Sequence, residues 1–256
     1  RSVCGLETSA AGRGVRPFRS PHHTASYSAM VGGGPRLRPG LVTQAHHGVL
    51  VLDELAEFDR HVLDALRQPL EDGSGEILRA HGSVTSPARV QLSAAMNPCR
   101  CGWDGDPVRT CRCPTGLPER YRRRVSGPLL DRIDLRVVMP RMEPVELTAL
   151  DQPESSLVVS QRIHAAWDRA MERNTGLPNA SLRGQQLLRI CALDGAARKA
   201  LEDLAQRLDL TARGVHRLLR VARTIADLNG RGSVTDEHLG AAAQLNDRTF
   251  EQDAAA

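Results

Sequence analysis

Lysine is almost absent from this sequence. Lys199 is the only lysine among the 34 lysine and arginine residues. A phosphate-binding loop of the G-x-x-x-x-G-K-[ST] type requires a lysine that reaches the β- and γ-phosphates of a nucleotide. Lys199 stands in "GAARKALE", a stretch of helical character with no glycine-rich loop before it. The sequence therefore excludes a loop of this type within these 256 residues.

Long apolar runs are missing as well. None approaches the roughly 20 residues that span a bilayer, so we predict no transmembrane segment, no membrane partner and a cytoplasmic protein. The opening "RSVCGLETSAAGRG" has neither a signal-peptide core nor an initiating methionine, and we expect the chain to begin partway through a domain. The net charge of +4 is too small to indicate nucleic-acid binding by itself. Arginine suits bidentate contact with phosphate, but coding bias explains its excess equally well.

The first part of the chain mixes strand and helix patterns. Asp59 is the expected N-cap of a helix, and Gly73 is its expected stop. The predicted elements are a buried strand at 48–53, a helix at 59–73, a β-hairpin turning near His81–Gly82, a strand at 90–96, and a short helix leading into a strand that stops at Pro140.

After residue 141 the strand patterns give way to helical ones. In the clearest helix, Thr211 is the predicted N-cap and Gly230 the predicted C-cap. The predicted helices cover residues 155–173, 194–208, 211–229 and 235–246. The fold class is therefore α/β, with an α/β domain at 1–142 followed by a helical domain at 143–256.

Two adjacent acids end the strand "GVLVLDEL". The carboxyl end of a buried parallel strand opens into a site crevice. Asp53 could there orient a water bound to Mg²⁺, and Glu54 could polarise an attacking water. Taken alone the pair is ambiguous, because surface acids after a buried strand are common. Asn97, at the tip of the next predicted strand, could hold the same water or sense a γ-phosphate.

Several long motifs carry a specific resemblance. They are "RPFRSPHHTAS", "VGGGPRLRPGLVTQAHHGVLVLDELAEF", "VLDALRQPLEDG", "AAMNPCRCG", "SGPLLDRIDL" and "ARGVHRLLRVARTIADL". The chain resembles the magnesium-chelatase-like AAA+ proteins, and within them the YifB or ComM branch, over nearly its whole length. The resemblance implies a P-loop NTPase core with a helical lid, ATP and Mg²⁺ as cofactors, and a homo-oligomeric ring, expected to be a hexamer. It also implies DNA as a partner, with branch migration or helicase activity in natural transformation or recombination.

The resemblance assigns roles to individual residues. Asp53 and Glu54 match Walker B, Asn97 matches sensor 1, and Arg132 matches the arginine finger offered to a neighbouring subunit. Arg213 best matches sensor 2, and Arg217 is the runner-up.

The resemblance also defines two inserts. "GGGPRLRPG" would be the helix-2 insert facing the ring pore, and "ILRAHGSVTSPAR" the pre-sensor-1 hairpin. Arg36, Arg38 and Arg79 are available there for DNA phosphates, although a solvated hairpin explains them equally well.

One departure from the family is the missing Walker A loop. It predicts a chain truncated just downstream of the P-loop, with little or no ATP binding and no hydrolysis by the 256 residues alone. One alternative function is a catalytically incomplete oligomerisation or DNA-binding fragment. Another is a magnesium-chelatase subunit acting on a porphyrin, for which no residue provides a site.

Four cysteines cluster in "NPCRCGWDGDPVRTCRC". Cys99, Cys101, Cys111 and Cys113 form two C-x-C pairs that could give the closed tetrahedral shell of a structural Zn²⁺. The spacing is less usual than C-x-x-C, and free redox-labile thiols or disulfides are the alternatives. A reducing cytosol favours the metal. We expect Cys191, in "LLRICAL", to be a buried small apolar residue.

Two histidine pairs and an arginine run complete the candidates. The pairs are His22–His23 and His46–His47, expected to be polar loop residues beside a nucleotide or pore, with a second metal site as the alternative. The run "ERYRRRVSG" could contact a neighbour's phosphate or DNA, or could be solvated.

Overall fold

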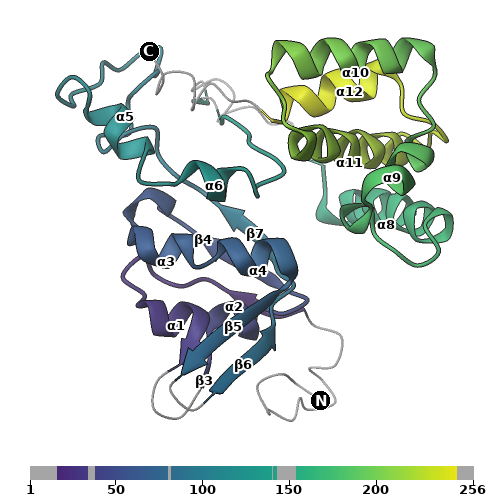
Figure 1. The fold of residues 1–256 in the computed structure, drawn as a ribbon. Coiled ribbons are helices and arrows are strands. Elements are labelled where there is room, and N and C mark those ends of the chain that lie inside the picture. Colours follow the sequence, from purple (N-terminus) through teal and green to yellow (C-terminus); the bar gives the residue numbers. More distant parts are fainter. Residues whose placement is uncertain (1–15, 34–37, 80–81, 140, 143–153, 247–256) are drawn as a thin grey trace. The chain divides into compact units, whose positions relative to one another are not determined.

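The computed structural model describes residues 16–33, 38–79, 82–139, 141–142 and 154–246 (Figure 1). The chain forms two units, divided between Ile133 and Asp134, and each is described by itself. Within the described ranges, no helix is long and apolar enough to cross a membrane.

A parallel sheet organises the first unit. The strand β4 (Val49–Leu52) lies between β1 (Phe18–Arg19) and β7 (Gln91–Ala94), and both neighbours run parallel to it. Gly48, just before β4, permits this approach, because an added Cβ would lie 1.9 Å from the carbonyl oxygen of Pro17. The predicted α/β class with a buried strand is thereby confirmed.

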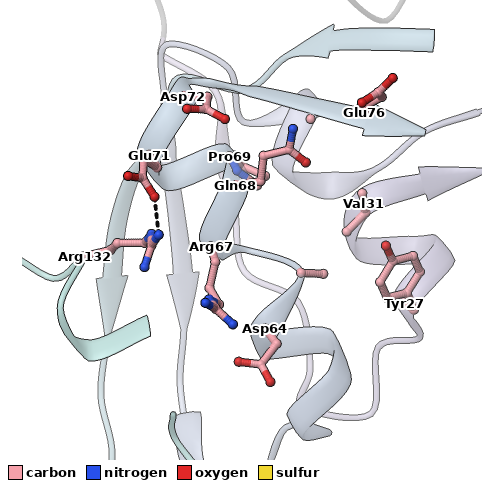
Figure 2. Close-up of a pocket in the computed structure, with 12 residues that line it drawn as sticks. Tyr27, Val31, Asp64, Arg67, Gln68, Pro69, Glu71, Asp72, Glu76 and Arg132 are labelled. Carbon is pink, nitrogen blue, oxygen red and sulfur yellow. Dashed lines mark hydrogen bonds and ion pairs between the residues drawn. The ribbon is translucent and has the colours of Figure 1, made fainter. Parts of the chain in front are cut away.

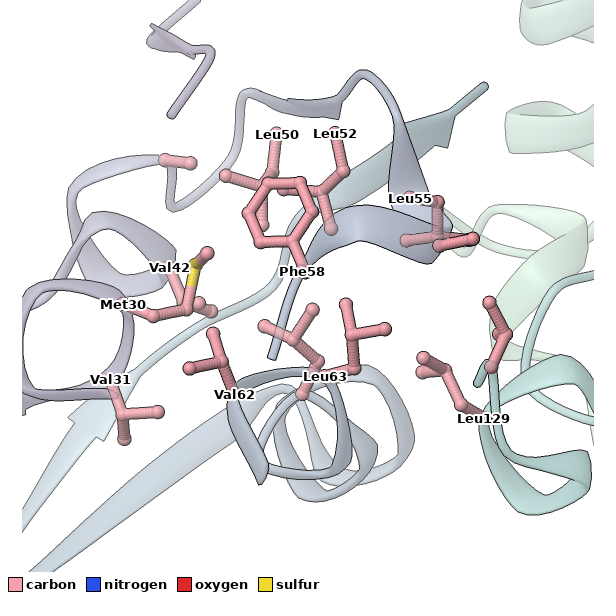
Figure 3. Close-up of a cluster of buried hydrophobic side chains, with 14 of the residues drawn as sticks. Met30, Val31, Val42, Leu50, Leu52, Leu55, Phe58, Val62, Leu63 and Leu129 are labelled. Carbon is pink, nitrogen blue, oxygen red and sulfur yellow. The ribbon is translucent and has the colours of Figure 1, made fainter. Parts of the chain in front are cut away.

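Short helices accompany the sheet in the first unit. They are α1 (Tyr27–Val31), α2 (Leu41–Gln44), α3 (Arg60–Asp64), α4 (Arg67–Asp72), α5 (Leu117–Arg122) and α6 (Gly127–Leu130), with a 3₁₀ turn at Leu55–Glu57. Leu50 and Leu52 of β4 point into the core beside Phe58, and Val62 and Met30 contribute to it from the helices (Figure 3). This buried packing fixes the end of β4 in place.

The predicted helix at 59–73 was wrong in its continuity. Asp59 is the N-cap, accepting a hydrogen bond from the His61 N–H, and Gly73 ends the second segment in the left-handed region. Between them the chain breaks into α3 and α4 at Ala65 and Leu66. Pro69 explains the break, because proline has no N–H to donate and its ring clashes with the carbonyl four residues earlier.

Two antiparallel ribbons project from the first unit. The strand β2 (Gly32–Gly33) pairs with β3 (Arg38–Pro39), and β5 (Ser74–Arg79) pairs with β6 (Gly82–Pro87). The second ribbon confirms the predicted hairpin, since Arg79 pairs with Gly82.

The strand predicted to end at Pro140 was wrong. Over residues 131–139 the structure has turns and a single β-bridge, between Arg136 and Asn246. A strand needs a neighbouring chain to pair with its N–H and C=O groups along its length. This segment finds such a neighbour at one residue, and its Val137 and Val138 are exposed.

The second unit is helical. Its helices are α8 (Ser156–Arg173), α9 (Gly184–Cys191), α10 (Gly195–Arg207), α11 (Ala212–Leu228) and α12 (Asp236–Gln244), with a 3₁₀ turn at Asn179–Ser181. The four predicted helices are confirmed, and Thr211 caps α11 by accepting from the Gly214 N–H at 3.2 Å. Asn229 is the C-cap, and Gly230 follows it in the left-handed region. The sequence did not predict α9, which is short and begins with a glycine.

A buried ionic network crosses this helical unit. The Asp227 carboxylate accepts hydrogen bonds from Arg223 at 2.9 Å and from Arg173 at 3.0 Å. Asn179 donates to the same carboxylate at 2.8 Å. Although burial raises the pKa of Asp227, the hydrogen bonds from Arg173 and Asn179 and the charge of Arg223 lower it overall.

Candidate nucleotide-hydrolysis edge and cysteine knuckle

The acid pair lies at the carboxyl edge of the parallel sheet. Asp53 and Glu54 directly follow β4, and both are exposed. An oxygen of Asp53 accepts a hydrogen bond from the Glu54 N–H at 2.9 Å. Glu54 has a φ of 53° and a ψ of 45°, a left-handed conformation that costs a non-glycine residue free energy. The backbone is therefore held in an unusual shape at the residue expected to polarise water.

Backbone hydrogen bonds continue the sheet beyond this edge. The Ala95 N–H donates to the Leu52 carbonyl at 3.0 Å, and the Leu55 N–H donates to the Ala95 carbonyl at 2.9 Å. These bonds bracket the acid pair and join the chain after β4 to the chain after β7. Asn97 follows two residues later with an exposed side chain. Because the strands are parallel, Asp53, Glu54 and Asn97 all leave the same edge of the sheet.

A histidine that follows β1, the remaining strand of the sheet, also reaches this edge. His23 follows β1, and its Nδ1 lies 2.9 Å from a carboxylate oxygen of Glu54. The His23 ring packs edge-on against Phe58, with centroids 6.5 Å apart. Its contact with His22 is tilted, with centroids 4.1 Å apart. Sequence reasoning left His23 as a loop residue without a partner. The "HH" pair was visible, but its contact with Glu54 depends on the pairing of β1 with β4.

The predicted arginine finger is engaged within this chain. Arg132 forms an ion pair with Glu71 of α4 and donates to the Pro128 carbonyl at 2.6 Å (Figure 2). It borders a cavity of about 380 Å³ whose lining includes Asp64, Asp72 and Glu76. The Arg132 guanidinium thus already has an anionic partner, Glu71, within the chain.

The two sensor 2 candidates lie in the second unit and differ in burial. Arg213 is exposed in the first turn of α11, whereas Arg217 is buried, with 3% of its surface exposed. The exposed side chain is the better placed of the two to meet a ligand. Its role as sensor 2 stays a prediction.

Only part of the predicted DNA-contacting inserts is described. Arg38 is exposed on β3, opposite Gly33. Arg36 lies outside the described residues. Arg79 ends β5, and its side chain also lies outside the described residues.

The four cysteines converge as the sequence predicted. Their sulfurs all lie within 4.8 Å of one another. Cys99 Sγ is 3.4 Å from Cys101 Sγ and 3.7 Å from Cys111 Sγ. The sulfurs of Cys101 and Cys111 are 3.6 Å apart. A tetrahedral Zn²⁺ with Zn–S bonds of about 2.3 Å separates its sulfurs by about 3.8 Å. The cysteine knuckle, residues 99–113, therefore has the size and donor set of a Cys₄ metal site.

Hydrogen bonds favour the thiolate at Cys101 but not at every cysteine of the cluster. The backbone N–H groups of Arg112 and Trp103 stabilise a thiolate and lower the pKa of Cys101 to about 6. Although a hydrogen bond with the Cys113 backbone lowers the pKa of Cys111, burial and the neighbouring thiols raise it to about 12 overall.

Arg122, from the arginine run, donates to the Pro98 carbonyl at 3.3 Å and to Asp104 at 2.5 Å. Arg122 is buried and fastens the knuckle to α5.

The rest of the arginine run is divided between paired and exposed positions. Arg124 forms an ion pair with Glu57 at 3.1 Å, and Arg120 and Arg123 are exposed. Arg122 and Arg124 thus have partners within the chain. A contact of the run with a neighbour's phosphate or with DNA stays a prediction.

His46 and Cys191 have local roles. His46 Nδ1 accepts a hydrogen bond from the Arg89 N–H at 3.1 Å, and burial together with the charges of His47 and Arg89 lowers its pKa. Among the described residues, the only group with metal-ligand spacing is the four cysteines, so neither histidine pair forms a metal site there. Cys191 is fully buried, as predicted, and burial raises the pKa of its thiol to about 11.

Two family models account for almost the whole chain. Residues 1–147 match the magnesium chelatase subunit ChlI, and residues 153–246 match its C-terminal domain. The chain belongs to the magnesium chelatase ChlI family. The resemblance predicted from the motifs is thereby confirmed, and with it an AAA+-like domain with a parallel sheet followed by a helical region.

Named relatives of this ChlI-family chain fall into two groups. The chain is 46% identical to the YifB protein of Escherichia coli over 88% of its length and 44% of the relative's. It is 44% identical to the competence protein ComM of Haemophilus influenzae over 89% of its length and 44% of the relative's. The magnesium-chelatase 38 kDa subunit of Acidiphilium rubrum is 29% identical over 84% of the chain and 56% of the relative. The chain thus spans less than half the length of YifB and ComM.

Proposed function

We propose that this chain supplies the hydrolytic half of an ATP site in a ring-forming AAA+ motor that remodels DNA. The observation that carries the proposal is the convergence of Asp53, Glu54, Asn97 and His23 at one edge of three parallel strands. Ligands of open α/β sheets bind at this carboxyl edge. The likeness to the competence protein ComM supports a role in competence, and the resemblance to the YifB and ComM branch implies DNA as the substrate.

Each residue at this edge has a chemical task. Glu54 accepts the proton of the attacking water, and Asn97 holds that water by its amide. Asp53 would hold a water of the Mg²⁺ that accompanies the nucleotide, and the bound ion would neutralise charge on the phosphates. His23 fixes one oxygen of Glu54 and so limits the directions in which the carboxylate can point.

The arginines link the site to a ring. Arg132 is the finger for a neighbouring subunit's γ-phosphate, and Arg213 is the sensor of the helical lid. Because Arg132 is paired with Glu71 in the single chain, Glu71 competes with that phosphate for the guanidinium. Assembly into a ring, a hexamer by resemblance, would exchange one anionic partner for the other.

The cysteine knuckle holds a structural Zn²⁺ in this proposal. Cys99, Cys101, Cys111 and Cys113 supply a closed shell, so the ion has no open position for substrate. Because the knuckle follows Asn97 directly, a bound ion would let the four cysteines brace the loop that leaves the hydrolysis edge.

A chimera tests the proposed activity. The part of Escherichia coli YifB that precedes the region matching this chain, which the family resemblance implies carries the phosphate-binding loop, is joined to this chain in place of the matching region. We expect Mg²⁺-dependent ATP hydrolysis that single-stranded or branched DNA accelerates. A folded, ring-forming chimera without hydrolysis would contradict the proposal.

A second candidate is an assembly or DNA-binding module without turnover. The position of Lys199 favours it for the isolated chain, because this one lysine lies on α10 of the helical unit. Hydrolysis by the chimera separates the two candidates, because under the second one a folded chimera would assemble or bind DNA without turning over ATP.

A further inference from the structure

In both C-x-C pairs of the cysteine knuckle, the residue between the cysteines is an arginine. Arg100 lies between Cys99 and Cys101, and Arg112 lies between Cys111 and Cys113. Because the flanking sulfurs converge on one centre, the middle side chains face away from it. Both arginines are exposed. The metal-binding geometry thus places two guanidinium groups on the outside of the knuckle.

An aromatic ring lies between these arginines in the sequence. The guanidinium carbon of Arg109 is 4.3 Å from the centroid of the Trp103 ring, a cation–π contact. Asp106 fixes the turn that carries Arg109, because its carboxylate accepts from the N–H groups of Val108 and Arg109 at 2.8 and 2.6 Å. A hollow of about 450 Å³ is lined by Trp103, Arg109, Thr110, Cys111 and Arg112.

The charge balance of the knuckle surface is positive. Three exposed arginines, Arg100, Arg109 and Arg112, belong to it. Of the two acids in the loop, Asp104 is ion-paired with the buried Arg122, and Asp106 is occupied with backbone N–H groups. Both carboxylates of the loop therefore already have partners, and an anion that approaches the hollow meets exposed guanidinium groups.

The chemistry of this surface matches single-stranded nucleic acid. A flat ring paired with a guanidinium offers a stacking face for an unpaired base, and neighbouring arginines offer contacts for successive phosphates. A stacked base inside a duplex exposes only its edges, so a duplex could use the arginines but not Trp103. Bracing the hydrolysis edge explains Arg122 but requires neither Trp103 nor the outward arginines.

We propose that the cysteine knuckle is a binding site for single-stranded nucleic acid. A base stacks against the Trp103–Arg109 pair, and Arg100 and Arg112 contact the flanking phosphates. The inference deepens the proposed DNA role and rests on it. It assigns the contact to the knuckle, in addition to the two arginine-bearing ribbons.

The test uses the 256-residue chain purified with zinc and a fluorescein-labelled oligothymidine of about 15 nucleotides, a length within the site sizes of single-strand binders. Fluorescence anisotropy measures the dissociation constant. We expect Trp103→Ala to raise it on the order of tenfold, since base–aromatic stacking is lost. Trp103→Phe keeps an aromatic face and should recover most of the affinity.

Matched controls separate stacking from folding. Trp167→Ala removes the other tryptophan, on α8 of the helical unit, and should leave binding unchanged. Zinc content and circular dichroism of Trp103→Ala and Trp103→Phe should equal those of the wild type. Arg100→Ala and Arg112→Ala should each lower the slope of log affinity against log salt by about 0.7, the value for one single-strand phosphate contact.

The outcomes distinguish this inference from the proposed function. Unchanged affinity in Trp103→Ala, with firm binding by the wild type, overturns the knuckle site and leaves DNA as a partner. Tighter binding of a duplex than of the single strand also overturns it. If the wild type binds no DNA, both the knuckle site and the DNA role fail, while hydrolysis by the chimera still tests the nucleotide site.

Discussion

Glu54 is constrained by three separate features. Its backbone is left-handed, its N–H donates to Asp53, and its carboxylate contacts His23. A residue held at such a conformational cost requires support from its surroundings. The support here comes from strand ends distant in sequence, which identifies His23 as the residue that orients Glu54.

His23 offers a test at the residue scale. In the ATP-hydrolysing chimera, we expect His23→Ala to lower kcat on the order of tenfold with KM for ATP within about twofold, because a misoriented base affects the chemical step and not nucleotide binding. His23→Gln retains a donor and should restore part of kcat. His164→Ala, an exposed histidine on α8, is the control. A rise in KM as large as the fall in kcat would instead indicate a general structural defect.

Arg132 carries a second prediction at this scale. Glu71→Gln removes the carboxylate that pairs with Arg132. If a neighbour's phosphate competes for this guanidinium, ATP-dependent assembly of the chimera should occur at severalfold lower protein concentration, measured by sedimentation. Asp72→Asn, an adjacent acid on the same cavity, is the matched control. Weaker assembly in Glu71→Gln would contradict the competition.

The cysteine knuckle is the element whose chemistry is most directly measurable. Elemental analysis under reducing conditions should give one zinc per chain, and Cys111→Ser should lose most of it. Cys191→Ala, which removes a buried thiol outside the knuckle, should keep the zinc. We also expect a chelator to lower the melting temperature of the wild type, because structural zinc contributes to folding. A wild type without zinc would exclude the metal.

The buried network of the helical unit predicts a stability effect. Asp227→Ala would leave Arg223 buried and uncompensated, so we expect a loss of about 3–5 kcal/mol in the free energy of unfolding. Urea titration followed by Trp167 fluorescence in a Trp103→Phe background measures it. Asp203→Ala, an exposed acid on α10, should change stability by less than about 0.5 kcal/mol.

The same network predicts a pH dependence. The pKa of Asp227 is depressed in the folded state, so its contribution is complete above the unfolded carboxyl's pKa of roughly 4. This stabilising contribution is lost as the pH falls through the pKa that Asp227 has in the folded state. The stability difference between wild type and Asp227→Ala should therefore narrow below pH about 4. If the stability difference between wild type and Asp227→Ala did not change with pH, lost packing rather than lost charge would explain the destabilisation.

Local patterns account for the elements that sequence predicted well. Val49–Leu52, the cap at Asp59 and the cap at Thr211 depend on neighbours within a few residues. The break caused by Pro69 was also local, and a stricter use of proline's effect on the preceding turn would have found it. The strand expected before Pro140 failed because strand formation depends on a partner, which apolarity does not provide.

At the scale of the molecule, distant pairings decided what the sequence could not. The His23–Glu54 contact spans 31 residues and the Arg132–Glu71 pair spans 61. Neither follows from spacing, because both require the packing of the first unit. The acids, Asn97 and the cysteines were predicted because motifs of fixed order carry them. The roles of the acids, Asn97, Arg132, Arg213 and Arg217 remain predictions.

The whole chain should lack turnover on its own. Without a phosphate-binding loop in its 256 residues, we expect no detectable ATP hydrolysis and very weak ATP binding, measured with a fluorescent ATP analogue. Robust hydrolysis by the isolated chain would contradict this expectation and would mean that the chain holds phosphates by a different kind of site.

The most direct test of the central claim compares Glu54→Gln with the wild type in the chimera. We predict a fall in kcat of about 10²–10⁴-fold, the usual contribution of a general base, with ATP affinity unchanged and ring assembly retained. The isosteric amide keeps the shape of the side chain but cannot accept the proton from water. Hydrolysis by Glu54→Gln at the wild-type rate would contradict the assignment of this edge as the hydrolytic half of the site.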